Sequence, residues 1–163
     1  MPNSHSTIEQ YFNLGGKSVL ITGASGQVGS ELCETFLSFG CKVIATDLNS
    51  SSNLAIDDKS LEYFHLDITD KDEIYSVFKK MFEKHSGIDI LINNAGVNPF
   101  NNPKDRTEAD FDFVSNVNLK GTFFCIQSFG LLSKNKECNA SIINTASHYG
   151  IISPDFRIYT DCN

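Results

Sequence analysis

The sequence predicts an α/β protein in which helices cover a parallel sheet on both faces, and two observations carry this prediction. Short runs rich in valine and isoleucine alternate with longer segments whose apolar residues recur at helical spacing, which is typical of successive βαβ units. A glycine-rich stretch, TGASGQVG at 22–29, joins the first apolar run to the first helical segment. Together they predict a Rossmann-type, doubly wound parallel sheet of about five strands.

The first half of the chain is predicted to contain three strands and one helix. Residues 17–22, 41–46 and 61–66 are short apolar runs, so each is expected to be a buried strand. Between the first two runs, residues 26–40 carry apolar side chains at helical spacing. Gly40 is expected to supply the stop of that helix.

The clearest helix is predicted over residues 69–87, where the apolar side chains form a single stripe. Thr69 or Asp70 can cap its start, and Glu73 stands at capping-box spacing from Asp70. Gly87 is expected to end the helix.

The second half of the chain adds two strands and a long helix. Residues 88–93 and 140–145 are predicted strands, and residues 107–132 are predicted to form one helix between them. Because crossovers between parallel strands are right-handed, the topology is nearly fixed. We expect a short arm at 1–14 and a single domain over 15–163, in which the fifth strand is an open edge.

The composition argues against several classes of function. The 163 residues carry a formal net charge of -7, and this acidity disfavours nucleic acid as a partner. No apolar run approaches the length of a membrane span, and the first residues do not resemble a secretory signal. The five cysteines form no C-x-x-C pair and the four histidines fall at no metal-ligand spacing. We therefore expect a cytoplasmic protein with reduced thiols, no membrane association and no metal site.

The glycine-rich stretch has the context that a dinucleotide-binding turn requires, because it lies between a predicted strand and a predicted helix. One glycine makes the tight turn, one lets the backbone approach a pyrophosphate, and one lets the helix pack against the strand. The helix N-terminus then offers free N–H groups to the phosphates. The residues expected to contact the dinucleotide here are Gly23, Ser25, Gly26, Gln27, Val28 and Gly29.

An acid follows the second predicted strand. Asp47 lies close to the ~20 residues after the glycines at which dinucleotide-binding units place a carboxylate. A carboxylate there accepts a hydrogen bond from a ribose 2′-hydroxyl and repels a 2′-phosphate, which favours NAD over NADP as cofactor. The alternative is an aspartate that only opens the polar loop at 47–60.

Four further stretches resemble the short-chain dehydrogenase/reductase family. They are HLDITD at 65–70, NNAG at 93–96, NVNLKGTFF at 116–124 and IINTASHYG at 142–150. Each stretch alone is weak evidence. Their shared order and spacing from residue 17 to about 150 makes the resemblance specific.

The resemblance implies further contacts with the cofactor. It places Asp67 and Ile68 beside the adenine ring, and it places Asn93, Ala95 and Gly96 in the motif that steadies the sheet next to the dinucleotide. Each polar residue has a simpler alternative. Asp67 could cap the region that follows it, and Asn93 could be a turn residue.

The resemblance also implies a catalytic role for Asn118 and Ser147, with Ser147 binding the oxygen of a small-molecule substrate. The alternatives are a solvent-facing asparagine in a helix and an ordinary serine. The family transfers hydride between nicotinamide and a hydroxyl or keto carbon. A tyrosine passes the proton, and a lysine four residues later lowers the pKa of that tyrosine.

The tyrosine–lysine pair is missing after Ser147. Tyr159 lies at nearly the right separation, but Asn163 stands four residues later and has no charge to lower a tyrosine pKa. A loop aromatic is therefore the favoured interpretation of Tyr159. SHYGIISPDFRIY at 147–159 is similar to bacterial reductases linked to surface-polysaccharide or flagellin-glycan modification, which carry an insertion after the serine. This likeness implies that the domain over 15–163 is an NAD-binding domain truncated at its C-terminus, which ends before its catalytic pair and is inactive.

Two alternatives stay open at this point. The chain could be a non-catalytic module that binds a dinucleotide, or it could be a nucleotide-sugar epimerase or dehydratase, because the spacing G-x-x-G-x-x-G is typical of that branch. NNAG at 93–96 counts against the second alternative. Members of the family form homo-oligomers, often through later helices that are not expected in this chain.

Overall fold

A computed structural model describes residues 13–49, 54, 56–99, 102–134 and 140–152. In these residues, five parallel strands form one sheet with the order β3-β2-β1-β4-β5. The strands are β1 (Ser18–Thr22), β2 (Lys42–Asp47), β3 (Leu61–His65), β4 (Ile90–Asn93) and β5 (Ser141–Asn144). The predicted parallel sheet of about five strands is confirmed.

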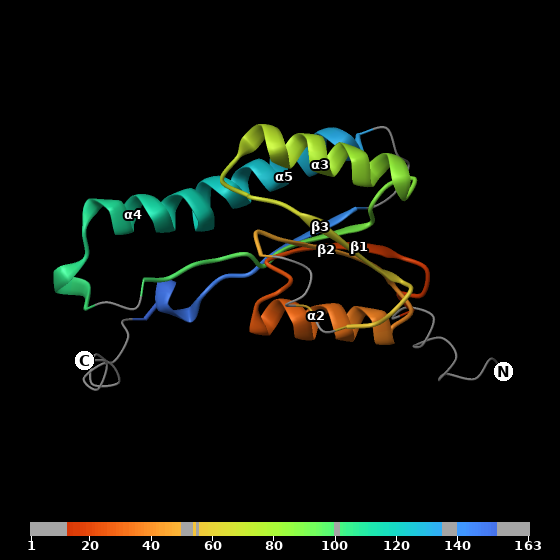
Figure 1. The fold of residues 1–163 in the computed structure, drawn as a ribbon, viewed down its shortest axis with the longest axis horizontal. Helices are drawn as coiled ribbons and strands as arrows, with labels where there is room; N and C mark the ends of the chain where they lie inside the picture. Colours follow the sequence, from red (N-terminus) through yellow and green to blue (C-terminus); the bar gives the residue numbers. More distant parts are fainter. Residues whose placement is uncertain (1–12, 50–53, 55, 100–101, 135–139, 153–163) are drawn as a thin grey trace.

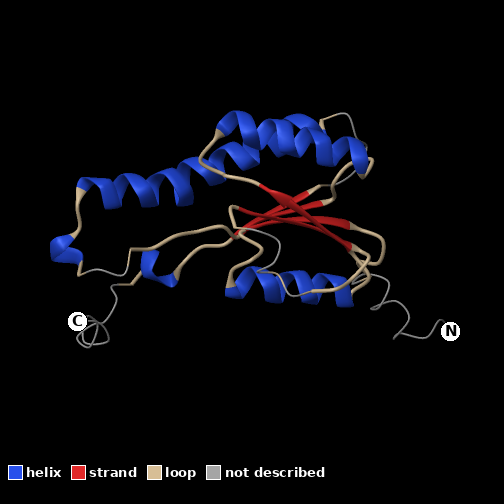
Figure 2. Ribbon diagram, in the orientation of Figure 1, coloured by secondary structure: helices blue, strands red, loops and turns tan. Residues whose placement is uncertain are grey.

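Helices cover both faces of the sheet, which confirms the doubly wound arrangement. The helix α2 (Gln27–Ser38) lies on one face, and α3 (Lys71–Lys84) and α5 (Thr122–Ser133) lie side by side on the other (Figure 1). The three layers are visible in Figure 2, with the strands between the helices.

Each face of the sheet has its own apolar core because neighbouring residues of a strand point to opposite faces. Leu20, Ile44 and Leu91 belong to the cluster under α3 and α5. Val19 and Val43 belong to the cluster under α2. The central strands therefore need apolar residues at nearly every position, which explains the continuous apolar runs in the sequence.

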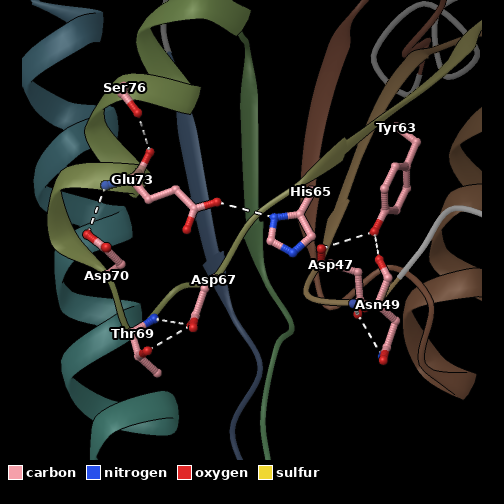
Figure 3. Close-up of polar contacts among 9 residues, drawn as sticks. All are labelled: Asp47, Asn49, Tyr63, His65, Asp67, Thr69, Asp70, Glu73 and Ser76. Atoms are coloured by element: carbon pink, nitrogen blue, oxygen red, sulfur yellow. Dashed lines mark hydrogen bonds and ion pairs between the residues drawn. The ribbon is translucent and has the colours of Figure 1, made fainter.

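The ends of α3 follow the predicted signals with one difference. The side chain of Asp70 accepts hydrogen bonds from the backbone N–H groups of Asp72 and Glu73, and Gly87 has a positive φ of 106° just after the helix. The carboxylate of Glu73 does not return to the backbone of Asp70. It pairs instead with His65 Nδ1 at 3.3 Å (Figure 3), because the end of β3 lies next to the start of α3.

The single helix predicted over 107–132 is wrong in one respect, because it is divided. It begins as α4 (Glu108–Val114), capped by Thr107, continues through a π-helical segment, η3 (Ser115–Gly121), and ends as α5. A Cβ atom on Gly121 would lie 2.7 Å from the carbonyl oxygen of Ile68. The segment η3 therefore approaches the loop after β3 more closely than a residue with a side chain would permit.

The strand β5 lies at the edge of the sheet in the part of the chain that the structure describes, as expected. Its Ile142 and Ile143 are 38% and 49% exposed. Most of the predicted N-terminal arm lies outside the described residues. None of the described helices combines the length and the apolar character that crossing a membrane requires.

Candidate functional site

A pocket of about 970 Å³ lies at the carboxyl ends of the central strands, where open α/β sheets bind their ligands. It is lined by every residue predicted to contact a dinucleotide except Asn93: Gly23, Ser25, Gly26, Gln27, Val28, Gly29, Asp47, Asp67, Ile68, Ala95 and Gly96. Several other lining residues at the strand ends were not predicted, including Thr46, Leu66, Asn94 and Thr145. A signal was available for Thr46, Leu66 and Thr145, because each is the last residue of a predicted strand and the ends of parallel strands meet at this edge.

Two glycines of the turn at 22–29 are required by close backbone approaches. Gly23 has a positive φ of 66°, and a Cβ atom there would lie 2.6 Å from the Cα atom of Ala95. A Cβ atom on Gly29 would lie 2.1 Å from the carbonyl oxygen of Gly23. These contacts pack the start of α2 against β1 and the loop after β4.

The N-terminus of α2 is open toward the pocket. Gly26 is its N-cap residue, and no side chain caps this end of the helix. Residues 26–29 all line the pocket. An uncapped helix start that presents backbone N–H groups and no side chain at the cap fits an anion such as a pyrophosphate.

Asp47 forms the second feature of the pocket, and its carboxylate is held by two loops. One oxygen accepts a hydrogen bond from the backbone N–H of Ser25 at 2.9 Å. The other accepts from the backbone N–H and the side-chain amide of Asn49, at 2.9 and 3.0 Å (Figure 3). Asp47 is 9% exposed. It is therefore both a turn aspartate and a carboxylate at the wall of the pocket.

Asp67 also combines the two interpretations of the sequence. Its Oδ1 accepts hydrogen bonds from the backbone N–H and the hydroxyl of Thr69, both at 2.8 Å, so it organises the turn after β3 (Figure 3). Both Asp67 and the neighbouring Ile68 line the pocket. The pocket thus has carboxylates at the ends of two adjacent strands, β2 and β3.

The motif NNAG joins three strands, and its two asparagines differ in position. The amide of Asn94 donates to the carbonyl oxygens of Thr22 and Gly23, each at 3.1 Å, and Asn94 lines the pocket. The amide of Asn93 donates to the side chain of Asn144 on β5 at 2.8 Å, and Asn93 is buried. Asn93 therefore points into the sheet rather than to the pocket. Of the two asparagines, Asn93 was predicted to contact the dinucleotide, but Asn94 is the one that lines the pocket.

Asn118 lies in η3, and its side chain forms two hydrogen bonds with the loop after β4. Its Oδ1 accepts from the backbone N–H of Val97 at 2.8 Å, and its Nδ2 donates to the carbonyl oxygen of Val97 at 2.9 Å. A second hollow of about 570 Å³ adjoins this contact and is lined by Gly96, Val97, Asn98, Phe113 and Asn118. Although Asn118 is exposed, it is not a free surface residue.

Ser147 follows β5 and starts a short 3-10 turn, η4 (His148–Gly150). Its Oγ accepts from the backbone N–H of Tyr149 at 3.2 Å, and it is exposed. It lines neither hollow, although Thr145 lines the larger one. Tyr159 and Asn163 lie outside the described residues.

A tyrosine–lysine pair with a spacing of four does occur elsewhere in the described part of the chain. Tyr75 and Lys79 lie on α3, which covers one face of the sheet. Neither residue lines either hollow. The pair therefore has the spacing of the catalytic pattern without its location.

The buried thiols belong to the core rather than to the site. Cys33, Cys41 and Cys125 are free and buried. Burial raises the pKa of Cys33 and of Cys125 to about 12, so both thiols stay protonated and unreactive at neutral pH. Within the described residues, no group of histidine, cysteine or acidic side chains could hold a metal ion.

Comparisons with known proteins agree with this geometry. Residues 17–160 match the family model described as short chain dehydrogenase. The 3-oxoacyl-[acyl-carrier-protein] reductase FabG of Thermotoga maritima is 36% identical over 144 residues, which cover 85% of this chain and 58% of that protein. Galactitol 2-dehydrogenase of Agrobacterium fabrum is 32% identical over 140 residues, which cover 84% of this chain and 55% of that protein.

Solved structures give the same result. The short chain dehydrogenase from Leptospira borgpetersenii with bound NAD+ is 37% identical and matches with a TM-score of 0.83, covering 97% of this chain and 60% of that one. ElxO with NADP bound, at 24% identity and a TM-score of 0.78, shares the fold. The chain thus spans 55% to 60% of the length of the proteins compared here.

Proposed function

Because this chain belongs to the short-chain dehydrogenase/reductase family, we propose that its pocket binds NAD(H), the cofactor of the family's hydride transfer to or from a hydroxyl or keto carbon. The observation that carries the proposal is the pairing of the uncapped start of α2 with Asp47 at the end of β2, in one pocket. When bound, the nicotinamide supplies or accepts the hydride.

The residues of this chain divide the binding of the dinucleotide between them. The backbone N–H groups at the start of α2 would hold the pyrophosphate. Asp47 would accept from a ribose hydroxyl, and its charge would oppose the 2′-phosphate of NADP. Asp67 and Ile68 would lie on the adenine side. NAD is therefore the proposed cofactor, in preference to NADP.

The substrate would meet the chain beyond the loop after β4. We assign Ser147 to the substrate oxygen, toward which its hydroxyl can donate, and Asn118 to the support of Val97 at the rim of the second hollow. The two relatives named above act, by their names, on a 3-oxoacyl group and at the second carbon of galactitol. Both names describe a reaction at a keto or hydroxyl carbon. A sugar is one candidate for the substrate that carries this carbon in the present protein.

Proton transfer is the step for which these residues supply no group. General acid–base catalysis contributes on the order of 10²–10⁴-fold, and it needs a group whose pKa is matched to neutral pH. Asn163 stands where a lysine would follow Tyr159. The 163-residue chain is therefore proposed to bind NAD(H) without useful turnover. A non-catalytic dinucleotide-binding module is the second candidate function, and Asn163 at the position of the lysine favours it.

The test is a titration of the purified protein with NADH, followed by nicotinamide fluorescence. We expect saturable binding that Asp47→Ala weakens at least several-fold. Asp57→Ala removes an exposed carboxylate outside the pocket and should leave binding unchanged. If the folded wild-type protein does not bind NADH, the proposed function is wrong. Substrate-dependent oxidation of NADH by the 163-residue chain would instead refute the proposed lack of turnover.

A further inference from the structure

A tyrosine hydroxyl contacts the loop that follows β2, although this tyrosine does not line the pocket. Tyr63 lies on β3, and its ring packs against the apolar cluster under α2. Its hydroxyl lies 3.0 Å from the carbonyl oxygen of Asp47 and donates to that of Asn49 as well (Figure 3). One phenol thus contacts the backbone at both ends of the segment 47–49.

The hydroxyl of Tyr63 is suited to be a permanent donor. Burial raises the pKa of Tyr63, and the charge of Asp47 raises it further. The phenol therefore stays protonated at neutral pH and can donate to a carbonyl oxygen.

The segment 47–49 has few other attachments among the described residues. The carbonyl oxygen of Asp47 also accepts from the backbone N–H of Leu66, which continues the pairing of β2 with β3. Leu48 is 60% exposed and contributes little packing. No other hydrogen bond to the carbonyl oxygen of Asn49 joins it to a described residue. The hydroxyl of Tyr63 therefore ties the carbonyl group of Asn49 to another strand, while the hydrogen bonds from Asn49 to the carboxylate of Asp47 stay within the segment.

Fixing Asn49 also fixes the carboxylate of Asp47, because two donors of Asn49 hold one of its oxygens. The other oxygen is held by the backbone N–H of Ser25 in the glycine turn. A line of contacts thus runs from Tyr63 through Asn49 to the one carboxylate proposed to select the cofactor.

We propose that Tyr63 is a positioning residue for cofactor selection, which holds the carboxylate of Asp47 where it favours a ribose 2′-hydroxyl over a 2′-phosphate. This inference rests on the proposed binding of NAD(H). It assigns no direct contact between Tyr63 and the dinucleotide.

The test compares the Kd values of NADH and NADPH in the wild-type protein and in Tyr63→Phe, which keeps the ring and removes the hydroxyl. We expect the preference for NADH to fall roughly three- to tenfold, the size expected for one neutral hydrogen bond. Tyr75→Phe is the matched control, because that tyrosine lies on α3 and lines neither hollow. It should leave the preference unchanged.

Asp47→Asn shows whether Tyr63 acts through the carboxylate. This variant should lose most of the preference by itself, and adding Tyr63→Phe should then change the ratio of the two Kd values by less than about twofold. Without cofactor, hydrogen exchange should show faster exchange of the Asn49 amide in Tyr63→Phe than in the control.

The outcomes separate the two proposals. If the wild-type protein prefers NADH and Tyr63→Phe keeps the same preference, the inference is wrong, even where the variant melts at a lower temperature. If the folded wild-type protein binds neither dinucleotide, the proposed function fails and the inference fails with it.

Discussion

The three glycines of the turn at 22–29 meet different physical constraints. Gly23 and Gly29 each face backbone atoms within 3 Å of a Cβ position, so neither can carry a side chain without moving the chain. At Gly26 the nearest atom would be 3.4 Å from a Cβ, the carbonyl oxygen of Gly23. In the spacing G-x-x-G-x-x-G, the first and third glycines are therefore required by packing. The second glycine leaves the start of α2 without a side chain.

This difference predicts opposite behaviour for two alanine variants. Gly29→Ala should lower the free energy of unfolding by about 3 kcal/mol or more, because the added methyl would overlap a backbone oxygen. Gly26→Ala should cost less than about 1 kcal/mol but should weaken NADH binding, because the methyl lies at the proposed pyrophosphate site. Urea denaturation and NADH titration measure the two effects. A Gly26→Ala protein that unfolds easily, or binds NADH as the wild type does, would contradict this division.

The two asparagines of NNAG show where prediction from sequence stops at this scale. Both are polar residues at the end of an apolar strand, so composition does not separate them. The distinction is that Asn93 is the last residue of β4 to pair with β5, opposite Asn144, while Asn94 lies just beyond. The extent of strand pairing depends on β5, which is distant in sequence. The other pocket residues could be predicted because glycine spacing and an acid after the second strand are local signals.

At the scale of elements, the strands and helices were predicted where the apolar pattern is strong. The stripe of α3 and its cap Asp70 are local properties of the sequence. The division of the long helix is not, because η3 follows from contacts with other segments. Asn118 binds the backbone of Val97, and Gly121 approaches Ile68. Helix propensity carries no information on such contacts.

A carboxylate joins the starts of β1 and β4, and this contact predicts a dependence of stability on pH. Asp89 accepts hydrogen bonds from the backbone N–H and hydroxyl of Ser18, and it pairs with Lys17 at 3.1 Å. Burial acts to raise the pKa of Asp89, but the contacts with Ser18 and Lys17 outweigh it and hold that pKa below 3.8. Asp89 therefore favours the folded state more when it is ionised.

Because the folded pKa of Asp89 is depressed, its contribution to stability decreases as the pH falls. The contribution of Asp89 to stability is present above the unfolded pKa near 3.8 and is lost as the pH falls through the lower folded value. We expect Asp89→Asn to cost about 1–2 kcal/mol at pH 6, and the difference from the wild type to shrink below pH 4. Urea denaturation at several pH values between 3 and 6 measures this difference in the free energy of unfolding. A difference that stays constant over this range would show that the charge of Asp89 contributes nothing.

For the molecule as a whole, the doubly wound parallel sheet could be predicted, because apolar strands that alternate with helices form βαβ units whose crossovers are right-handed. The position of Ser147 could not, because a short turn after an edge strand has no apolar pattern that predicts it. Ser147 and η4 follow β5, whose four residues are all exposed. The segment around Ser147, the residue proposed to bind the substrate oxygen, is thus the part for which local sequence signals and described contacts are both fewest.

The exposed β5 predicts how the 163-residue chain behaves at high concentration. Ile142 and Ile143 lie on an edge strand whose other side has no partner among the described residues, and such edges promote association between chains. We expect light scattering to show concentration-dependent association of the wild-type chain, and Ile143→Thr to reduce it.

Threonine keeps the β-branched shape and removes apolar surface, so the free energy of unfolding of Ile143→Thr should fall by less than about 1.5 kcal/mol. NADH binding should not change, because Ile143 does not line the pocket. Ser141→Thr, on the same strand, keeps the apolar pair and should associate as the wild type does. A wild-type chain that stays monomeric at high concentration would contradict this prediction.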